Sequence, residues 1–270
     1  MDKGVNQYAM NINEHEQWFI NYFNRHRLKE KDDPAPLDLK YDHTFRVLNN
    51  AKDIVQNEEF SENIVKACLL SALYHDVARF EQYLKYRTFR DRESINHGIL
   101  GLKILACENC LKDEKAEIRK LVRVGVGLHN SFALPHKLSD NMKKVCYVVR
   151  DADKLDILRI IDGHLASTIP YNPTVVLNLP DDDTLCSDTV IKLALDKKIA
   201  SYSDLKCVND FRILLITWFF DLHFKASKIR FIKDGYAKRL LLSLPNNDKY
   251  GQIKEFLISE IFNNSMGLVG

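Results

Sequence analysis

The sequence is poor in the residues that interrupt helices. Its 270 residues include 10 glycines and 7 prolines, or about 4% and 3%. Both shares are below the roughly 7% glycine and 5% proline that are usual in globular proteins. This composition excludes collagen-like chains and low-complexity disordered chains. Apolar residues recur with helical periodicity along the chain, whereas strand-like alternation is almost absent. We therefore expect an all-α protein, organised as a helical bundle.

The sequence also lacks an excess of charge of either sign and a long apolar run. Its 39 basic and 37 acidic side chains nearly cancel, so it has no general basicity that would indicate a nucleic-acid partner. The most apolar stretch, residues 211–224, is short and contains Arg212 and Asp221. Such a stretch is typical of a buried helix and not of a membrane span. We expect neither a nucleic-acid nor a membrane partner.

Two further signals are missing. The first residues do not show a basic region followed by an apolar run, which is the pattern of a secretion signal. A cytoplasmic location is therefore the expectation. Cys107 and Cys110 form a CxxC pair, but no second pair with similar spacing accompanies it. The cysteines therefore do not predict a structural zinc site.

Helical periodicity and the positions of Gly, Pro and Asp predict the elements and their organisation. We expect a helical core over residues 1–180 and a helical extension over 181–270 that packs on the core or forms a homodimer interface. The expected helices span residues 14–26, 42–56, 61–80, 94–107, 115–128, 140–161, 187–198, 203–224 or beyond, and 251–262.

Several ionisable residues fall on the apolar faces of the expected helices. His75 and Asp76 continue two apolar stripes of one helix, and His129 and Asp153 continue the stripes of two others. A carboxylate that faces a core costs several kcal/mol unless it is paired or binds a metal. One bound cation would satisfy all four side chains.

Two more histidines, His43 and His97, lie at the starts of other expected helices and extend this set. The set mixes imidazole nitrogen with carboxylate oxygen, which suits Mn²⁺, Fe²⁺, Co²⁺, Ni²⁺ or Zn²⁺ better than a site limited to Mg²⁺. The candidate metal ligands, in chain order, are His43, His75, Asp76, His97, His129 and Asp153.

The order of these residues resembles that of the HD-domain metal-dependent phosphohydrolases. The resemblance covers roughly residues 41–161 and rests on His43, on the His75-Asp76 doublet in LLSALYHDVARF, and on Asp153 in DADKLD. It implies an all-α fold in which these residues bind one divalent metal ion. His97 and His129 match the extra positions of members that bind a second ion, with the doublet aspartate bridging. The resemblance therefore implies a cofactor of one or two divalent ions.

Two positions of this match need separate attention. Both Asp151 and Asp153 are candidates for the last ligand, and the family pattern of Ala, Asp, a basic residue and Leu favours Asp153. Arg79 follows His75 by four residues, where many dinuclear members carry a lysine that contacts the substrate phosphate. An arginine can take that role, because its guanidinium binds phosphate in a bidentate manner.

By this resemblance the protein is a metal-dependent phosphohydrolase. It would hydrolyse a phosphate ester of a nucleotide or of another small phosphorylated metabolite with metal-activated water. Asp76 and Arg79 are then the catalytic residues, and Arg79 also binds the substrate. Further candidates for phosphate binding are Lys154, Arg87 and Arg90. The general acid is open between Asp91 and Glu81.

Two alternatives from other functional classes stay open. A minority of dinuclear HD proteins hold two irons and oxidise C–H bonds with O₂, using a similar ligand set. A non-catalytic signalling module would use the same metals and arginines to hold a nucleotide without turnover. The bound metals and the presence of turnover distinguish the three functions.

Overall fold

The structure is a computed structural model that describes residues 12–166, 171 and 175–263. These residues form helices and no strand, which confirms the all-α prediction. The chain divides into two compact units, residues 1–153 and 154–270. The boundary between two compact units need not be a domain boundary. The expected domain boundary at residue 180 therefore stays a prediction.

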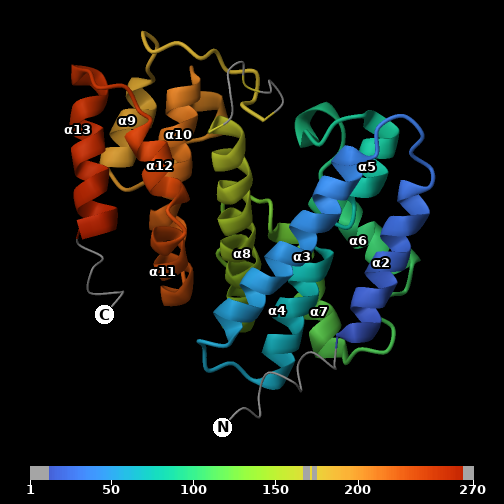
Figure 1. Ribbon diagram of the computed structural model, residues 1–270. Coiled ribbons are helices and arrows are strands. Elements are labelled where there is room, and N and C mark those ends of the chain that lie inside the picture. The colour runs from blue at the N-terminus through green and yellow to red at the C-terminus, as the bar shows by residue number, and fades with distance from the viewer. Residues whose placement is uncertain (1–11, 167–170, 172–174, 264–270) are drawn as a thin grey trace. The chain divides into compact units, whose positions relative to one another are not determined.

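The first unit is built around one buried helix. Helix α4 packs against both α3 and α7, and α6 packs against α7 (Figure 1). Every residue of α4 from Ala67 to its end is buried, because apolar side chains lie on all sides of this helix. The elements of the unit are α2 (Asn13–Arg27), α3 (Ala35–Val55), α4 (Glu62–Tyr74), α5 (Arg79–Tyr86), the 3₁₀ turn η1 (Asp91–Glu93), α6 (His97–Cys107), α7 (Ala116–Leu128) and the first part of α8 (Asp140–Leu165).

Two predicted helices of this unit have the wrong bounds. The helix expected at 42–56 begins at Ala35, because a proline such as Pro36 is compatible with the first turn of a helix. The helix expected at 61–80 is two helices, α4 and α5, separated by a turn over residues 75–78. His75 keeps right-handed helical dihedrals in this turn, so the apolar periodicity continues where the regular helix does not.

The second unit surrounds a helix that is buried along its whole length, α10 (Val208–Thr217). The other elements are the end of α8, α9 (Asp188–Leu195), the 3₁₀ turns η2 (Tyr202–Asp204) and η3 (Trp218–Asp221), α11 (Lys225–Lys233), α12 (Tyr236–Leu242), α13 (Asp248–Leu257) and the π-helical turn η4 (Ile258–Asn263). Among the described residues, no helix is both long enough and apolar enough to span a membrane.

The single helix expected at 203–224 is also wrong. The α-helical part ends at Thr217, a 3₁₀ turn follows, and Leu222 is extended. Helices α11 and α12, which the sequence did not predict, come next and are separated by Gly235 with a positive φ of 74°. Short helices of seven to nine residues carry little periodic signal, which explains why they were missed.

The close contact between α4 and α7 requires a glycine at position 125. A Cβ atom there would lie 2.5 Å from Ser71 Oγ and 2.8 Å from Ser71 Cβ, inside van der Waals contact. Gly163 in α8, by contrast, has no atom within 4 Å of its Cβ position. The two glycines therefore offer a matched pair of substitutions.

We expect Gly125→Ala to destabilise the protein by about 1–3 kcal/mol, the usual cost of overpacking a core. Gly163→Ala should be neutral or stabilising by about 0.5–1 kcal/mol, because alanine favours an open helix position. Urea and thermal unfolding of the two variants measure the difference. Equal effects on stability would contradict the close α4–α7 contact.

Candidate metal centre

Two groups of histidine and aspartate side chains meet in the first unit. One group comprises His43, His75 and Asp153, and the other comprises Asp76, His97 and His129. In each group the three ligand atoms lie within 4.8 Å of one another. The structure thus brings together the six side chains that the sequence selects as candidate ligands.

Helix ends position three of the four histidines. His75 and His129 directly follow the last residues of α4 and α7. His97 is the first residue of α6, and the Asn96 side chain accepts the N–H of Ile99 to fix the start of that helix. Because the backbone turns at a helix end, these imidazoles reach one point from different elements.

The first group is compact around His43, which lies inside α3. Its Nε2 atom is 3.0 Å from Asp153 Oδ1 and 3.4 Å from His75 Nε2. His75 Nε2 and Asp153 Oδ1 are 3.9 Å apart. Ligand atoms that lie about 2.0–2.2 Å from one metal ion are separated by roughly 3.0–3.6 Å, so these three atoms are close to the spacing that an ion requires.

Asp76 lies between the two groups and offers one oxygen to each. Its Oδ2 atom is 3.7 Å from the Nε2 atoms of both His43 and His75. Its Oδ1 atom is 3.3 Å from His97 Nε2 and 3.8 Å from His129 Nε2. This arrangement suits a carboxylate that bridges two ions.

Three of the imidazoles are oriented by hydrogen bonds through Nδ1. His75 Nδ1 donates to Ala72 O at 2.7 Å, and His129 Nδ1 donates to Val126 O at 2.8 Å. A carbonyl only accepts, so the Nδ1 atoms carry the protons and a neutral ring presents a lone pair at Nε2.

His97 is held in the same way by a carboxylate, because its Nδ1 lies 2.7 Å from Asp91 Oδ2. Its Nε2 atom is only 2.9 Å from His129 Nε2. Two acceptor lone pairs at this distance repel each other unless a cation lies between them. The two facing Nε2 lone pairs therefore fit a metal ion at this group.

Burial and local charge set the protonation states needed for metal binding. Burial lowers the pKa of His75 to about 4 and that of His97 to about 3, so both rings are neutral near pH 7. Burial opposes ionisation of Asp76, but the charges of Lys40 and Arg79 hold the pKa of its carboxyl well below the usual range. Neutral imidazoles and ionised carboxylates are the forms that coordinate metals.

The comparison with protein families agrees with this centre. The family model described as HD domain matches residues 41–158. This segment is therefore similar to HD domains. HD domains belong to a superfamily of metal-dependent hydrolases. No curated protein and no solved structure gives a significant match to the chain.

Arg79, the expected phosphate-binding residue, lies at the edge of this candidate metal centre. Its Nε donates to Asp76 Oδ1 at 3.1 Å, and its Nη1 donates to Gln82, Phe89 O and Asp91. Its Nη2 has no hydrogen-bond partner among the residues that the structure describes. The guanidinium is thus fixed on two sides and keeps one nitrogen for a ligand.

The other expected phosphate-binding residues are paired elsewhere. Arg87 contacts Glu30 and Asp32, and Arg90 contacts Glu93. Lys154 belongs to the second unit, where its ammonium pairs with Asp221. The role of Arg87, Arg90 and Lys154 in substrate binding stays a prediction.

Lys40 and the positioning role of Asp91 were not predicted from the sequence. Lys40 Nζ lies 2.7 Å from Asp76 Oδ2, and no pattern marked it, because Lys40 precedes the helix expected at residues 42–56. Asp91 accepts from His97, Arg79 and Gln82. Asp91 lies in a short 3₁₀ turn, outside the helices whose apolar periodicity marked the ligand candidates.

Four acidic residues left open by the sequence have defined places. Asp153 belongs to the first ligand group, whereas Asp151 is fully buried and belongs to neither group found among the described residues. Glu81 accepts the Tyr22 hydroxyl at 2.9 Å, and Asp91 is engaged with His97. The geometry favours Asp153 as the last ligand and gives Asp91 a positioning role.

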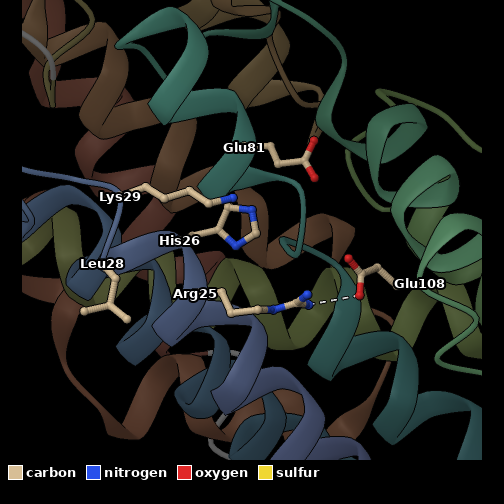
Figure 2. Close-up of a pocket in the computed structure, with 6 residues that line it drawn as sticks. All are labelled: Arg25, His26, Leu28, Lys29, Glu81 and Glu108. Atoms are coloured by element: carbon tan, nitrogen blue, oxygen red, sulfur yellow. Dashed lines mark hydrogen bonds and ion pairs between the residues drawn. The ribbon is translucent and has the colours of Figure 1, made fainter.

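A cavity of about 340 Å³ lies apart from the ligand candidates. Its lining residues are Arg25, His26, Leu28, Lys29, Glu81 and Glu108 (Figure 2). The close-up shows Arg25 and Glu108 facing each other, and their side chains are 2.9 Å apart. Positive and negative groups line the same wall, so the cavity has no single charge that would select a class of ligand.

The contact between Asp91 and His97 predicts how the second ligand group responds to substitution. The negative charge of Asp91 orients the His97 imidazole and raises the basicity of that ring. Asp91→Asn removes this charge. We expect Mn²⁺ binding at the Asp76, His97 and His129 group to weaken by roughly 10–100-fold, as is usual for residues that hold a metal-binding histidine. Isothermal titration calorimetry of the metal-depleted protein measures this change.

Glu93→Gln is the matched control, because Glu93 lies on the same 3₁₀ turn but is exposed and pairs with Arg90. It should bind Mn²⁺ as the wild type does. If Asp91→Asn also bound both ions with wild-type affinity, the positioning role of Asp91 would be refuted.

Proposed function

We propose that the protein is a metal-dependent phosphohydrolase that acts on a nucleotide or another small phosphorylated metabolite. The observation that carries this proposal is the pair of histidine-containing groups that share the two oxygens of Asp76. Two-metal sites of phosphatases hold their ions about 3.5–4 Å apart, and a shared carboxylate is suited to that spacing. Mn, Fe, Co, Ni and Zn all accept this mixture of ligands.

Each residue then has a defined task. His43, His75 and Asp153 would hold one divalent ion, His97 and His129 would hold a second, and Asp76 has an oxygen near each group. Divalent ions at this position supply two effects, because they lower the pKa of water towards neutrality and polarise a phosphoryl oxygen. The attacking water forms a new P–O bond, the ester P–O bond breaks, and the leaving oxygen takes up a proton.

Arg79 binds the phosphate group of the substrate. The hydrogen bonds to Asp76 and Phe89 O fix its guanidinium. Nη2, which has no hydrogen-bond partner among the described residues, can then donate to a phosphate oxygen. A preorganised donor of this kind stabilises the charge that develops on the transferring group without reorganising during the reaction. Asp91 and Gln82 support this orientation through Nη1.

A screen of phosphorylated metabolites with added Mn²⁺, Co²⁺ or Ni²⁺ tests the function. We expect phosphate release from at least one substrate, and a loss of kcat/KM of more than about 100-fold in Asp76→Asn, because this change removes the bridging charge. Asp42→Asn alters an exposed carboxylate on α3 that pairs with Arg46, and it should retain wild-type activity.

Activity that survives Asp76→Asn would contradict the assigned site. A screen without any phosphate release, together with two bound irons and O₂ consumption, would indicate the di-iron oxygenase instead. Tight binding of a nucleotide without turnover would indicate the signalling module.

A further inference from the structure

The ammonium group of Lys40 lies inside the candidate metal centre. Lys40 belongs to α3, and its side chain is mostly buried with 18% exposure. Its Nζ is 2.7 Å from Asp76 Oδ2, and Asp76 is only 4% exposed. A buried ion pair of this kind is costly to break by removing one partner, so Lys40 is the main counter-charge of this oxygen in the protein as described.

Lys40 and Arg79 each pair with a different oxygen of the Asp76 carboxylate. Lys40 contacts Oδ2 and Arg79 contacts Oδ1. These are the same two oxygens that face the two histidine groups. The two side-chain cations thus place positive charge at the same oxygens that the proposed ions would contact.

A divalent ion held by His43 and His75 would approach the oxygen that Lys40 occupies. Asp76 Oδ2 is 3.7 Å from the Nε2 atoms of both histidines and 2.7 Å from the lysine ammonium. An ammonium and a divalent ion on one oxygen would repel each other strongly in a buried site. Lys40 must therefore leave Asp76 when the first ligand group is filled.

The aromatic ring of Phe89 lies beside both cations. It is 5.5 Å from Lys40 Nζ and 5.8 Å from the Arg79 guanidinium, measured to the ring centroid. The lysine stem has four rotatable bonds, and the ring face provides a favourable surface for its ammonium. Lys40 can therefore move away from Asp76 and stay close to Arg79.

We propose that Lys40 is a movable cation with two binding partners. It pairs with Asp76 in the metal-free protein, and it moves to the anionic group of the substrate, beside Arg79, when metal ions bind. This inference rests on the proposed phosphohydrolase function and assigns the phosphate group of the substrate a second side-chain partner.

The first test measures Mn²⁺ binding to the metal-depleted protein by isothermal titration calorimetry. Lys40→Met removes the competing ammonium, so the first ion should bind about tenfold more tightly than in the wild type. Lys52→Met is the matched control, because Lys52 lies on the same helix and pairs with Glu16 at 3.2 Å. Its Mn²⁺ affinity should equal that of the wild type.

The second test measures binding of inorganic phosphate to the Mn²⁺-loaded proteins. We expect Lys40→Met to bind phosphate roughly tenfold more weakly than the wild type and Lys52→Met to bind it normally. Lys40→Gln keeps a hydrogen-bond donor towards Asp76 and provides a second neutral variant if Lys40→Met does not fold. It should change both affinities in the same directions.

Unchanged or weaker Mn²⁺ binding in the neutral variants would overturn the proposal, and so would unchanged phosphate binding. These results are separate from the proposed function, because neither test requires hydrolysis. A wild-type protein that binds no Mn²⁺ would count against the phosphohydrolase itself.

Discussion

The carboxylate of Asp76, placed between two pairs of imidazoles, is the contact on which the rest of the site depends. Its oxygens face His43 and His75 on one side and His97 and His129 on the other. A buried carboxylate and facing imidazole lone pairs are unfavourable without nearby positive charge. Lys40 and Arg79 supply that charge in the side chains that the structure describes, and divalent ions would supply it in the active protein.

The helical framework explains how residues so far apart in the chain share one carboxylate. Helix α4 is buried from Ala67 to its last residue, Tyr74, immediately before His75 and Asp76. Helices α6 and α7 pack against each other and present His97 and His129 from their ends. The short 3₁₀ turn at Asp91 then orients His97 from outside the helices. Small shifts in these helix ends would alter the ligand spacing directly.

Much of this arrangement follows from the pattern of the sequence. The scarcity of Gly and Pro indicated the all-α fold, and charged residues on apolar faces indicated the ligands. The break between α4 and α5 was not predictable by periodicity, because residues of the turn such as His75 keep helical dihedrals. Lys40 was missed because a lysine near a helix start is usually solvated. Only tertiary packing shows that its ammonium reaches Asp76.

The central claim is that one carboxylate, that of Asp76, joins two metal sites. The most direct measurement is anomalous diffraction from a crystal of the Mn²⁺-loaded protein. The account predicts two manganese peaks about 3.5–4 Å apart, one beside His43, His75 and Asp153 and one beside His97 and His129, with Asp76 contacting both. A single peak, or two peaks that do not share Asp76, would contradict it.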